Sequence, residues 1–182
     1  IGRTLESIGL KVAIIPQPNW RDDLRDFKKL GKPRLFFGVS AGAMDSMVNK
    51  YTANKRLRSE DAYTPDGRID MRPEYPTLVY STILKELYPY IPVSAGGIEA
   101  SLRRLSHYDY WQDKLLPGIL IPSRADMMIY GAGEKPLKEI SFALQNGAKI
   151  GELTAVPQTV FLQKDIKKKD NDIYLYSYEE CL

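Results

Sequence analysis

The sequence predicts an α/β fold in which an open, doubly wound parallel sheet carries helices on both faces. Two observations predict it. Short apolar runs alternate along the chain with segments of helical periodicity, which favours parallel strands joined by helical crossovers. Several of these runs also end in glycine-containing turns, which is typical of strands that lead directly into a helix.

The first third of the chain supplies two helices and two strands. The apolar residues of 1–8 share one helical face, which predicts a helix. Residues 11–15 (KVAII) form an apolar run stopped by prolines, so a buried strand is expected. Asn19 suits the N-cap of a helix over 19–30, with aspartates in its favourable first turn. Residues 34–39 (RLFFGV) predict the second strand.

The same pattern resumes after residue 76. Apolar periodicity predicts helices over 77–88 and 137–147, and a mixed basic and aromatic stretch at 101–111 is expected to be a helical turn followed by a loop. Strands are predicted at 91–95, 119–121, 125–130, 156–162 and 173–178.

Residues 1–162 are expected to form one domain with an insertion at about 44–76. The insertion is polar, basic and rich in turns, including Pro65-Asp66-Gly67. Residues 163–182, which include the charge run 164–172, are expected to begin a connection to a further domain.

Composition excludes several classes of protein. A length of 182 residues with 43% hydrophobic and 27% charged residues is ordinary for one globular domain, and a net charge of +3 does not indicate nucleic acid or membrane binding. No apolar run reaches the roughly 18 residues of a membrane span. A single cysteine, Cys181, fits a reducing compartment, so we expect a soluble cytoplasmic protein. Together with the single histidine, His107, it cannot build a zinc or iron–sulfur site within this chain.

Candidate ligand-binding residues follow four of the predicted strands. Ligands of doubly wound sheets bind at the carboxyl ends of the strands, where glycines let backbone amides approach closely. The predicted crevice residues are Asn19, Ser40, Gly42, Gly96, Gly97, Glu99, Gly131, Gly133 and Glu134. The alternative is that each glycine only permits a tight turn. A dinucleotide site is disfavoured because Pro136 replaces the third fingerprint glycine and Glu134 stands where a pyrophosphate would bind.

A second candidate is the aromatic stretch after residue 106. His107, Tyr108, Asp109 and Trp111 could form a platform for a planar ligand, with His107 and Asp109 as an acid–base pair. The alternative is that the aromatic cluster only packs a loop onto the sheet, with the polar ends of its side chains satisfied by hydrogen bonds. No catalytic residue and no metal ligand is assigned in this chain.

The basic stretch 50–58, with Tyr51 and with Arg103–Arg104, offers a third candidate. It could bind RNA phosphates and stack a base. The alternatives are a solvated loop or a surface that docks against another domain.

Several motifs resemble the YgiQ family of radical SAM proteins, in the region that precedes their radical SAM domain. They are residues 44–47 (MDSM), 51–53 (YTA), 61–65 (DAYTP), 94–104 (SAGGIEASLRR) and 107–111 (HYDYW). The resemblance implies a downstream radical SAM domain as partner, with a [4Fe-4S] cluster and S-adenosylmethionine in the full-length protein. The family's Cys-x-x-x-Cys-x-x-Cys motif is absent here, so the fragment alone is not expected to be an enzyme.

A broader likeness is to the cobalamin-binding domains that precede many radical SAM domains. It rests on Gly96-Gly97 and on residues 126–134 (DMMIYGAGE) followed by Pro136. It implies a Rossmann-like, flavodoxin-type sheet with strand order 2-1-3-4-5, of which this chain lacks the first, central strand. Cobalamin is thereby a candidate ligand, although the Asp-x-His-x-x-Gly signature is missing. The sequence thus predicts an accessory domain that handles substrate or a corrinoid-type ligand, with an RNA-binding or purely structural module as the alternative.

Overall fold

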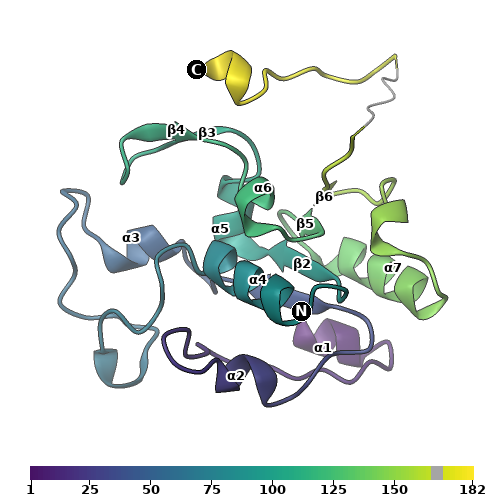
Figure 1. Ribbon diagram of the computed structural model, residues 1–182, viewed down its shortest axis with the longest axis horizontal. Coiled ribbons are helices and arrows are strands. Elements are labelled where there is room, and N and C mark those ends of the chain that lie inside the picture. The colour runs from purple at the N-terminus through teal and green to yellow at the C-terminus, as the bar shows by residue number, and fades with distance from the viewer. Residues whose placement is uncertain (165–169) are drawn as a thin grey trace.

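The computed structural model describes residues 1–164 and 170–182. Figure 1 shows the central sheet, the segment with α3 to one side, and the β3–β4 hairpin above. The elements are α1 (Gly2–Glu6), α2 (Arg25–Lys28), β1 (Phe37–Ser40), α3 (Ser46–Lys50), η1 (Pro65–Gly67), α4 (Pro76–Leu87), β2 (Val93–Gly96), α5 (Gly97–Leu102), β3 (His107–Asp109), β4 (Lys114–Leu116), α6 (Leu120–Ser123), β5 (Met127–Ile129), α7 (Glu134–Gln145), η2 (Ile150–Glu152), β6 (Thr159–Val160) and η3 (Glu179–Cys181).

The central sheet confirms the predicted open α/β fold. Its strand order is β1-β2-β5-β6, with β1, β2 and β5 parallel and β6 antiparallel to β5. The sheet is therefore mixed at one edge instead of wholly parallel. The three parallel strands end level with one another, because Ser40 pairs with Gly96 and Gly96 pairs with Ile129.

Apolar side chains cover both faces of the sheet, as a doubly wound fold requires. On one face, Val93 and Met128 pack with Tyr80 and Leu84 of α4. On the other face, a second cluster of buried residues joins the sheet to α7 and α1, and it contains Met127, Ile129, Leu137, Ile140 and Val156. Successive residues of β5 thus serve opposite cores, which explains why its sequence is apolar throughout.

Three predicted strands are wrong, those at 11–15, 119–121 and 173–178, and the neighbours of the first two explain why. Residues 11–15 are not a strand, and Ile14 is 76% exposed. The sheet places β1 at its edge, so the central strand expected between β1 and 11–15 is not among the described elements. Residues 119–121 instead run into helix α6, with Ile119 and Leu120 buried. Short buried apolar runs do not distinguish helix from strand.

Other predicted elements are shorter than expected. The helix at 19–30 is reduced to α2, because Asp22 and Asp23 accept hydrogen bonds from the Leu24 and Arg25 amides and hold a turn there. The strand at 156–162 is reduced to the two residues of β6, and 173–178 forms no strand. Residues 101–111 contain the end of α5 and then β3.

The connection expected at 163–182 falls partly outside the described residues. Residues 165–169 of its charge run are not described, and the run 170–182 ends in η3. Among the described residues, no helix combines the length and the apolar character that a membrane crossing demands.

The outer edge of β1 is open in this sheet, which gives the first prediction. The Phe37 amide donates to Pro92 O on the β2 side, so the amides of Gly38 and Ser40 point outward. We expect them to exchange with deuterium roughly 100-fold faster than those of Phe37 and Val39 in a chain of residues 1–182. Exchange resolved to single amides by mass spectrometry measures this. Equal protection of all four amides would contradict an open edge.

Candidate functional site

Three glycine turns stand side by side at the carboxyl edge of the parallel strands. Gly42 follows β1, Gly97 follows β2 and Gly131 follows β5, with φ angles of +103°, +84° and +69°. This left-handed region is costly for residues with a side chain, so the chain turns sharply here because glycine permits it. The result is an edge formed by backbone atoms, where a ligand can approach the main chain closely.

Gly97 also has no room for a side chain. A Cβ built on Gly97 lies 2.5 Å from Ser40 Oγ, and Ser40 Oγ in turn accepts the Gly42 amide at 3.1 Å. The turns after β1 and β2 therefore touch through Ser40. The Gly131 amide donates to Ser101 Oγ of α5 at 3.2 Å, which ties the third turn to the second.

Gly96, Gly133 and Glu134 also lie at this edge, whereas Asn19 is held in its own loop. Gly96 precedes α5 in extended conformation, and Gly133 precedes α7. Glu134 is exposed in the first turn of α7, where a carboxylate favours the positive end of the helix dipole. Asn19 hydrogen-bonds locally to Arg21, Asp22 and Asp26.

Glu99 lies under the edge and is fully buried. Its carboxylate accepts the Thr77 amide at 2.9 Å, in the first turn of α4, and the Ser46 amide at 3.3 Å, at the start of α3. The Ser46 hydroxyl also donates to it. One buried carboxylate thus caps two helix N-termini, which favour negative charge.

A buried ion pair stands beside Glu99. The Arg103 guanidinium binds Asp45, whose carboxylate also accepts the Met47 and Val48 amides as the N-cap of α3. Burial disfavours the charged form of Arg103. The hydrogen bond to Asp45 and the negative charges of Asp45 and Glu99 outweigh this and raise the pKa of Arg103 overall. This pair fixes α3 to the end of α5.

A second buried pair closes the segment 44–76. Arg72 binds both carboxylate oxygens of Asp61, the shortest contact being 2.9 Å, and donates to Ala41 O at 3.4 Å. Burial opposes the Asp61 charge, but hydrogen bonds from the Tyr63 amide and Arg72, together with the Arg72 charge, lower the pKa of Asp61 overall. The pair joins the far part of this segment to the turn after β1.

The predicted aromatic platform forms the β3–β4 hairpin. Asp109 is buried and accepts the Tyr75 hydroxyl at 2.8 Å, while burial and this bond raise the pKa of Tyr75. The Trp111 ring packs against Tyr51 at 5.4 Å between centroids. His107 Nδ1 lies 3.0 Å from Leu105 O. The Asp109 and Trp111 contacts attach the hairpin to the segment 44–76, and the His107 contact is local to the hairpin, so three of the four platform residues make structural contacts.

Tyr108 is the exposed member of the platform. Its hydroxyl binds Asp113 within the same hairpin, which raises the pKa of Tyr108. His107 and Asp109 are two residues apart on one strand, and each bonds elsewhere.

The basic stretch 50–58 makes many contacts inside the chain. Lys50 binds Asp70 at 2.8 Å, Arg58 donates to the Val48 and Tyr51 carbonyls, and Lys55 lies over the Tyr110 ring. The Tyr51 hydroxyl binds Glu74, which raises its pKa to about 12. Cations and rings engaged in this way are less available to phosphates and bases.

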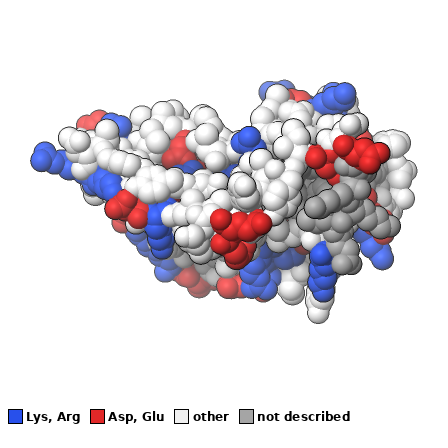
Figure 2. All heavy atoms as spheres, turned by 90° about the horizontal axis from the view of Figure 1, so that it is seen from above, with Lys and Arg blue, Asp and Glu red and all other residues white. Residues whose placement is uncertain are grey.

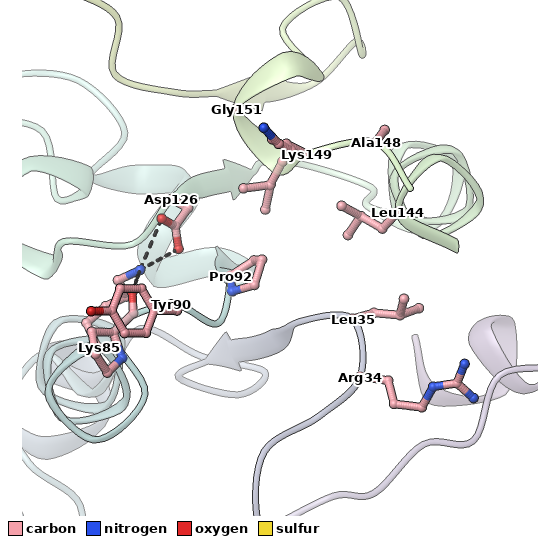
Figure 3. Close-up of a pocket in the computed structure, with 12 residues that line it drawn as sticks. Arg34, Leu35, Lys85, Tyr90, Pro92, Asp126, Leu144, Ala148, Lys149 and Gly151 are labelled. Carbon is pink, nitrogen blue, oxygen red and sulfur yellow. Dashed lines mark hydrogen bonds and ion pairs between the residues drawn. The ribbon is translucent and has the colours of Figure 1, made fainter. Parts of the chain in front are cut away.

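A cavity of about 360 Å³ lies at the opposite, amino edge of the sheet. Figure 3 shows Leu35, Pro92 and Leu144 around it, with Lys85 turned onto Asp126 in an ion pair of 3.0 Å. Within the described part of the chain, its lining contains none of the predicted crevice residues. The sequence patterns did not indicate this cavity, because its wall comes from strand starts and the end of α7.

The chain's own residues do not fit an iron–sulfur cluster. Such a cluster is held by several thiolates, and Cys181 is the single cysteine of the sequence. Among residues 1–164 and 170–182, no group of three or more His, Cys, Asp and Glu side chains is arranged to hold a metal ion. We therefore derive no chemical step through a cluster in these residues.

An open, largely parallel sheet with glycine turns along its carboxyl edge defines a Rossmann-like α/β domain. The chain belongs to the radical SAM N-terminal family, whose model matches residues 1–182. This confirms the family resemblance seen in the sequence.

Curated relatives carry UPF0313 names. The chain is 68% identical to a UPF0313 protein of Porphyromonas gingivalis over its whole length, covering 29% of that protein, and 65% identical to one of Bacteroides thetaiotaomicron, covering 32%. It is 51% identical to the UPF0313 protein YgiQ of Escherichia coli over 90% of the chain, covering 22% of that protein. The chain thus spans less than a third of these relatives. No solved structure matches it.

Removing the Glu99 carboxylate tests its capping role. Glu99→Ala leaves the Thr77 and Ser46 amides without their carboxylate partner and the Arg103 charge less compensated, so we expect a loss of about 3–5 kcal/mol in the free energy of unfolding. Urea unfolding measures it. The matched control is Glu139→Ala on the exposed face of α7, expected within about 0.5 kcal/mol of wild type. An equally small loss in the free energy of unfolding for both variants would contradict the capping role of Glu99.

The lowered pKa of Asp61 predicts an acid-sensitive contribution. A carboxylate whose folded pKa lies below its ordinary value of 3.8 stabilises the fold above that value, and this is lost as the pH falls through the folded pKa. Asp61→Asn is expected to cost about 3 kcal/mol at pH 7, and the gap to wild type should narrow below about pH 3.8.

Urea unfolding between pH 7 and pH 3 measures this gap. Asp66→Asn is the control, because Asp66 and Arg68 form an exposed pair in the same segment and its loss is expected to stay below about 0.5 kcal/mol. If the difference in free energy of unfolding between Asp61→Asn and wild type does not change with pH, the lowered pKa of Asp61 is refuted.

Proposed function

We propose that this chain is the accessory domain that precedes the radical SAM domain of a longer protein, and that it holds a corrinoid-type ligand or the substrate at its carboxyl edge. The observation that carries the proposal is the row of glycine turns at Gly42, Gly97 and Gly131, all in left-handed conformation on adjacent strands. Three such turns at the topologically favoured edge form a better-defined candidate site than one tight turn would.

The chemistry of the edge suits a large ligand held by shape and backbone contacts. Gly42 is exposed, and a Cβ built there meets nothing within 4 Å, so the space before it is open. The charged groups below the edge face inward. The Arg103 guanidinium binds the Asp45 carboxylate, and the Glu99 carboxylate accepts amides at two helix starts. Binding and positioning are thus the tasks assigned to this chain, and reaction chemistry is assigned to the radical SAM domain.

A corrinoid is the ligand class that is tested first. The histidine that would supply an axial ligand in one cobalamin class has no counterpart at this edge, because His107 lies in the hairpin. We therefore expect binding by the backbone edge without a histidine ligand.

The test is titration of the full-length protein with hydroxocobalamin. We expect about one equivalent to co-elute in gel filtration, read from the corrinoid absorption band. Gly42→Ala should weaken this binding at least tenfold, roughly 1.4 kcal/mol, because the added methyl group occupies the open approach.

Gly147→Ala is the matched control, since Gly147 has a φ of +88° and equal free space but follows α7, away from the edge. It carries similar backbone strain and should leave binding unchanged. If the protein elutes without corrinoid, a corrinoid is excluded as the ligand. If the Gly42→Ala variant and wild type bind with equal affinity, the carboxyl edge is excluded as the binding site.

A further inference from the structure

Helix α5 presents an apolar stripe to solvent on the side opposite its buried face. Glu99 and Ala100 point inward and are fully buried, whereas Ile98 and Leu102 are exposed, Leu102 to 61%. Residues four apart lie one above the other on a helix, so Ile98 and Leu102 form one stripe. A helix that packs only on its own sheet normally keeps polar residues on its outer face.

The stripe continues beyond the helix. The Ile119 amide donates to Arg103 O, and a Cβ built on Gly118 would lie 2.8 Å from Arg104 O, so the chain before α6 packs closely on the residues after α5. The Gly118 Cβ position also lies 3.6 Å from Leu105 C, and the Ile121 amide donates to Gly118 O, so exposed Leu105 and exposed Ile121 belong to two segments that are in contact. We call Ile98, Leu102, Leu105 and Ile121 the α5–α6 patch.

We propose that the α5–α6 patch is the surface on which the radical SAM domain of the same polypeptide docks. The inference rests on the proposed function, in which this chain precedes that domain. Contiguous exposed apolar residues on one side of a domain mark an interaction surface more often than isolated ones do. The patch begins directly beside the Gly97 turn, so a domain docked there would stand next to the proposed ligand edge.

The size of the patch favours an occupant tethered by the chain over a second copy. A stable complex between separate chains buries about 800 Å² on each partner, which is more than four side chains supply. A covalently linked domain binds at an effective concentration in the millimolar range, so a small patch is sufficient. The curated relatives have more than two thirds of their length outside the matched region, so a tethered domain of ample size is available in that family.

The path of the C-terminal residues also favours docking on this side of the molecule. Figure 1 shows residues 170–182 running beyond the β3–β4 hairpin, above the sheet, and this stretch exposes Ile173, Leu175 and Tyr176. Figure 2 looks down on that side and shows uncharged surface between groups of Lys, Arg, Asp and Glu side chains.

The test is photo-cross-linking of the full-length protein with p-benzoylphenylalanine at position 102. We expect intramolecular cross-links to peptides that follow residue 182, identified by mass spectrometry. Phe142 is the matched control position, because it is a large apolar residue of helix α7 that is 68% exposed. The probe at position 142 should give at least tenfold fewer such cross-links.

Three outcomes would overturn the proposal. They are equal cross-linking from both positions, no cross-link from position 102, and cross-links that join two copies within residues 1–182. Hydroxocobalamin plays no part in this experiment, so a failure of ligand binding and a failure of docking are separate results. Leu102→Glu provides a second measurement: it should raise the rate of protease cleavage within residues 163–182 about tenfold, whereas Phe142→Glu should not. Equal cleavage rates would also overturn the proposal.

Discussion

The architecture depends on a single buried carboxylate. Glu99 is removed from water entirely, and a lone carboxylate in that position would be strongly destabilising. It is tolerated because Thr77 and Ser46 donate to it from two helix starts and because the Arg103 charge stands one helical turn away. The same contacts fix where α3, α4 and α5 lie relative to the end of β2. The sharp turn at Gly97 is the place where the chain leaves the strand to bring Glu99 to this position.

This constraint separates the interior of the domain from its carboxyl edge. The ionisable groups Asp45, Asp61, Arg72 and Arg103 bind the segment 44–76 to the sheet and the glycine turns. Apart from the exposed Glu134 at the start of α7, the predicted crevice residues that remain at the carboxyl edge offer backbone and small side chains, which suit binding and positioning more than acid–base chemistry. The proposed accessory role beside a radical SAM domain is consistent with that division, since the proposal assigns reaction chemistry to that domain and only binding to this chain.

The sequence predicted the framework better than its details. Apolar runs located β1, β2 and β5, and helical periodicity located α4 and α7, because these elements are buried on a regular pattern. Residues 11–15 looked like a strand, but a parallel strand forms only beside a partner, and β1 is an edge strand here. The helix expected at 19–30 failed because Asp22 and Asp23 hold a turn that periodicity does not register.

The candidate site was predicted only in part, because only patterns local to the sequence could be seen. Left-handed glycines are visible as glycine after an apolar run, so Gly42, Gly97 and Gly131 were identified. Glu99 was grouped with them because it follows the same turn, and the structure places it inside the protein. Its partners Ser46 and Thr77 lie 53 and 22 positions away along the chain, and the neighbouring Asp45–Arg103 pair joins residues 58 positions apart. Spacing along the chain carries no signal of such contacts. The sequence did hold one local clue, an Asp-Ser pair ahead of an apolar turn, which is an N-cap pattern.

The most direct test is a double-mutant cycle between Asp45 and Glu99, with Asp45→Asn, Glu99→Gln and the double variant compared by urea unfolding. If the two carboxylates act as one buried network through Ser46 and Arg103, their effects will not add, and the coupling free energy will exceed about 1 kcal/mol. Additive losses within about 0.3 kcal/mol would show two independent contacts. The claim that one buried carboxylate network organises this edge of the sheet would then be wrong.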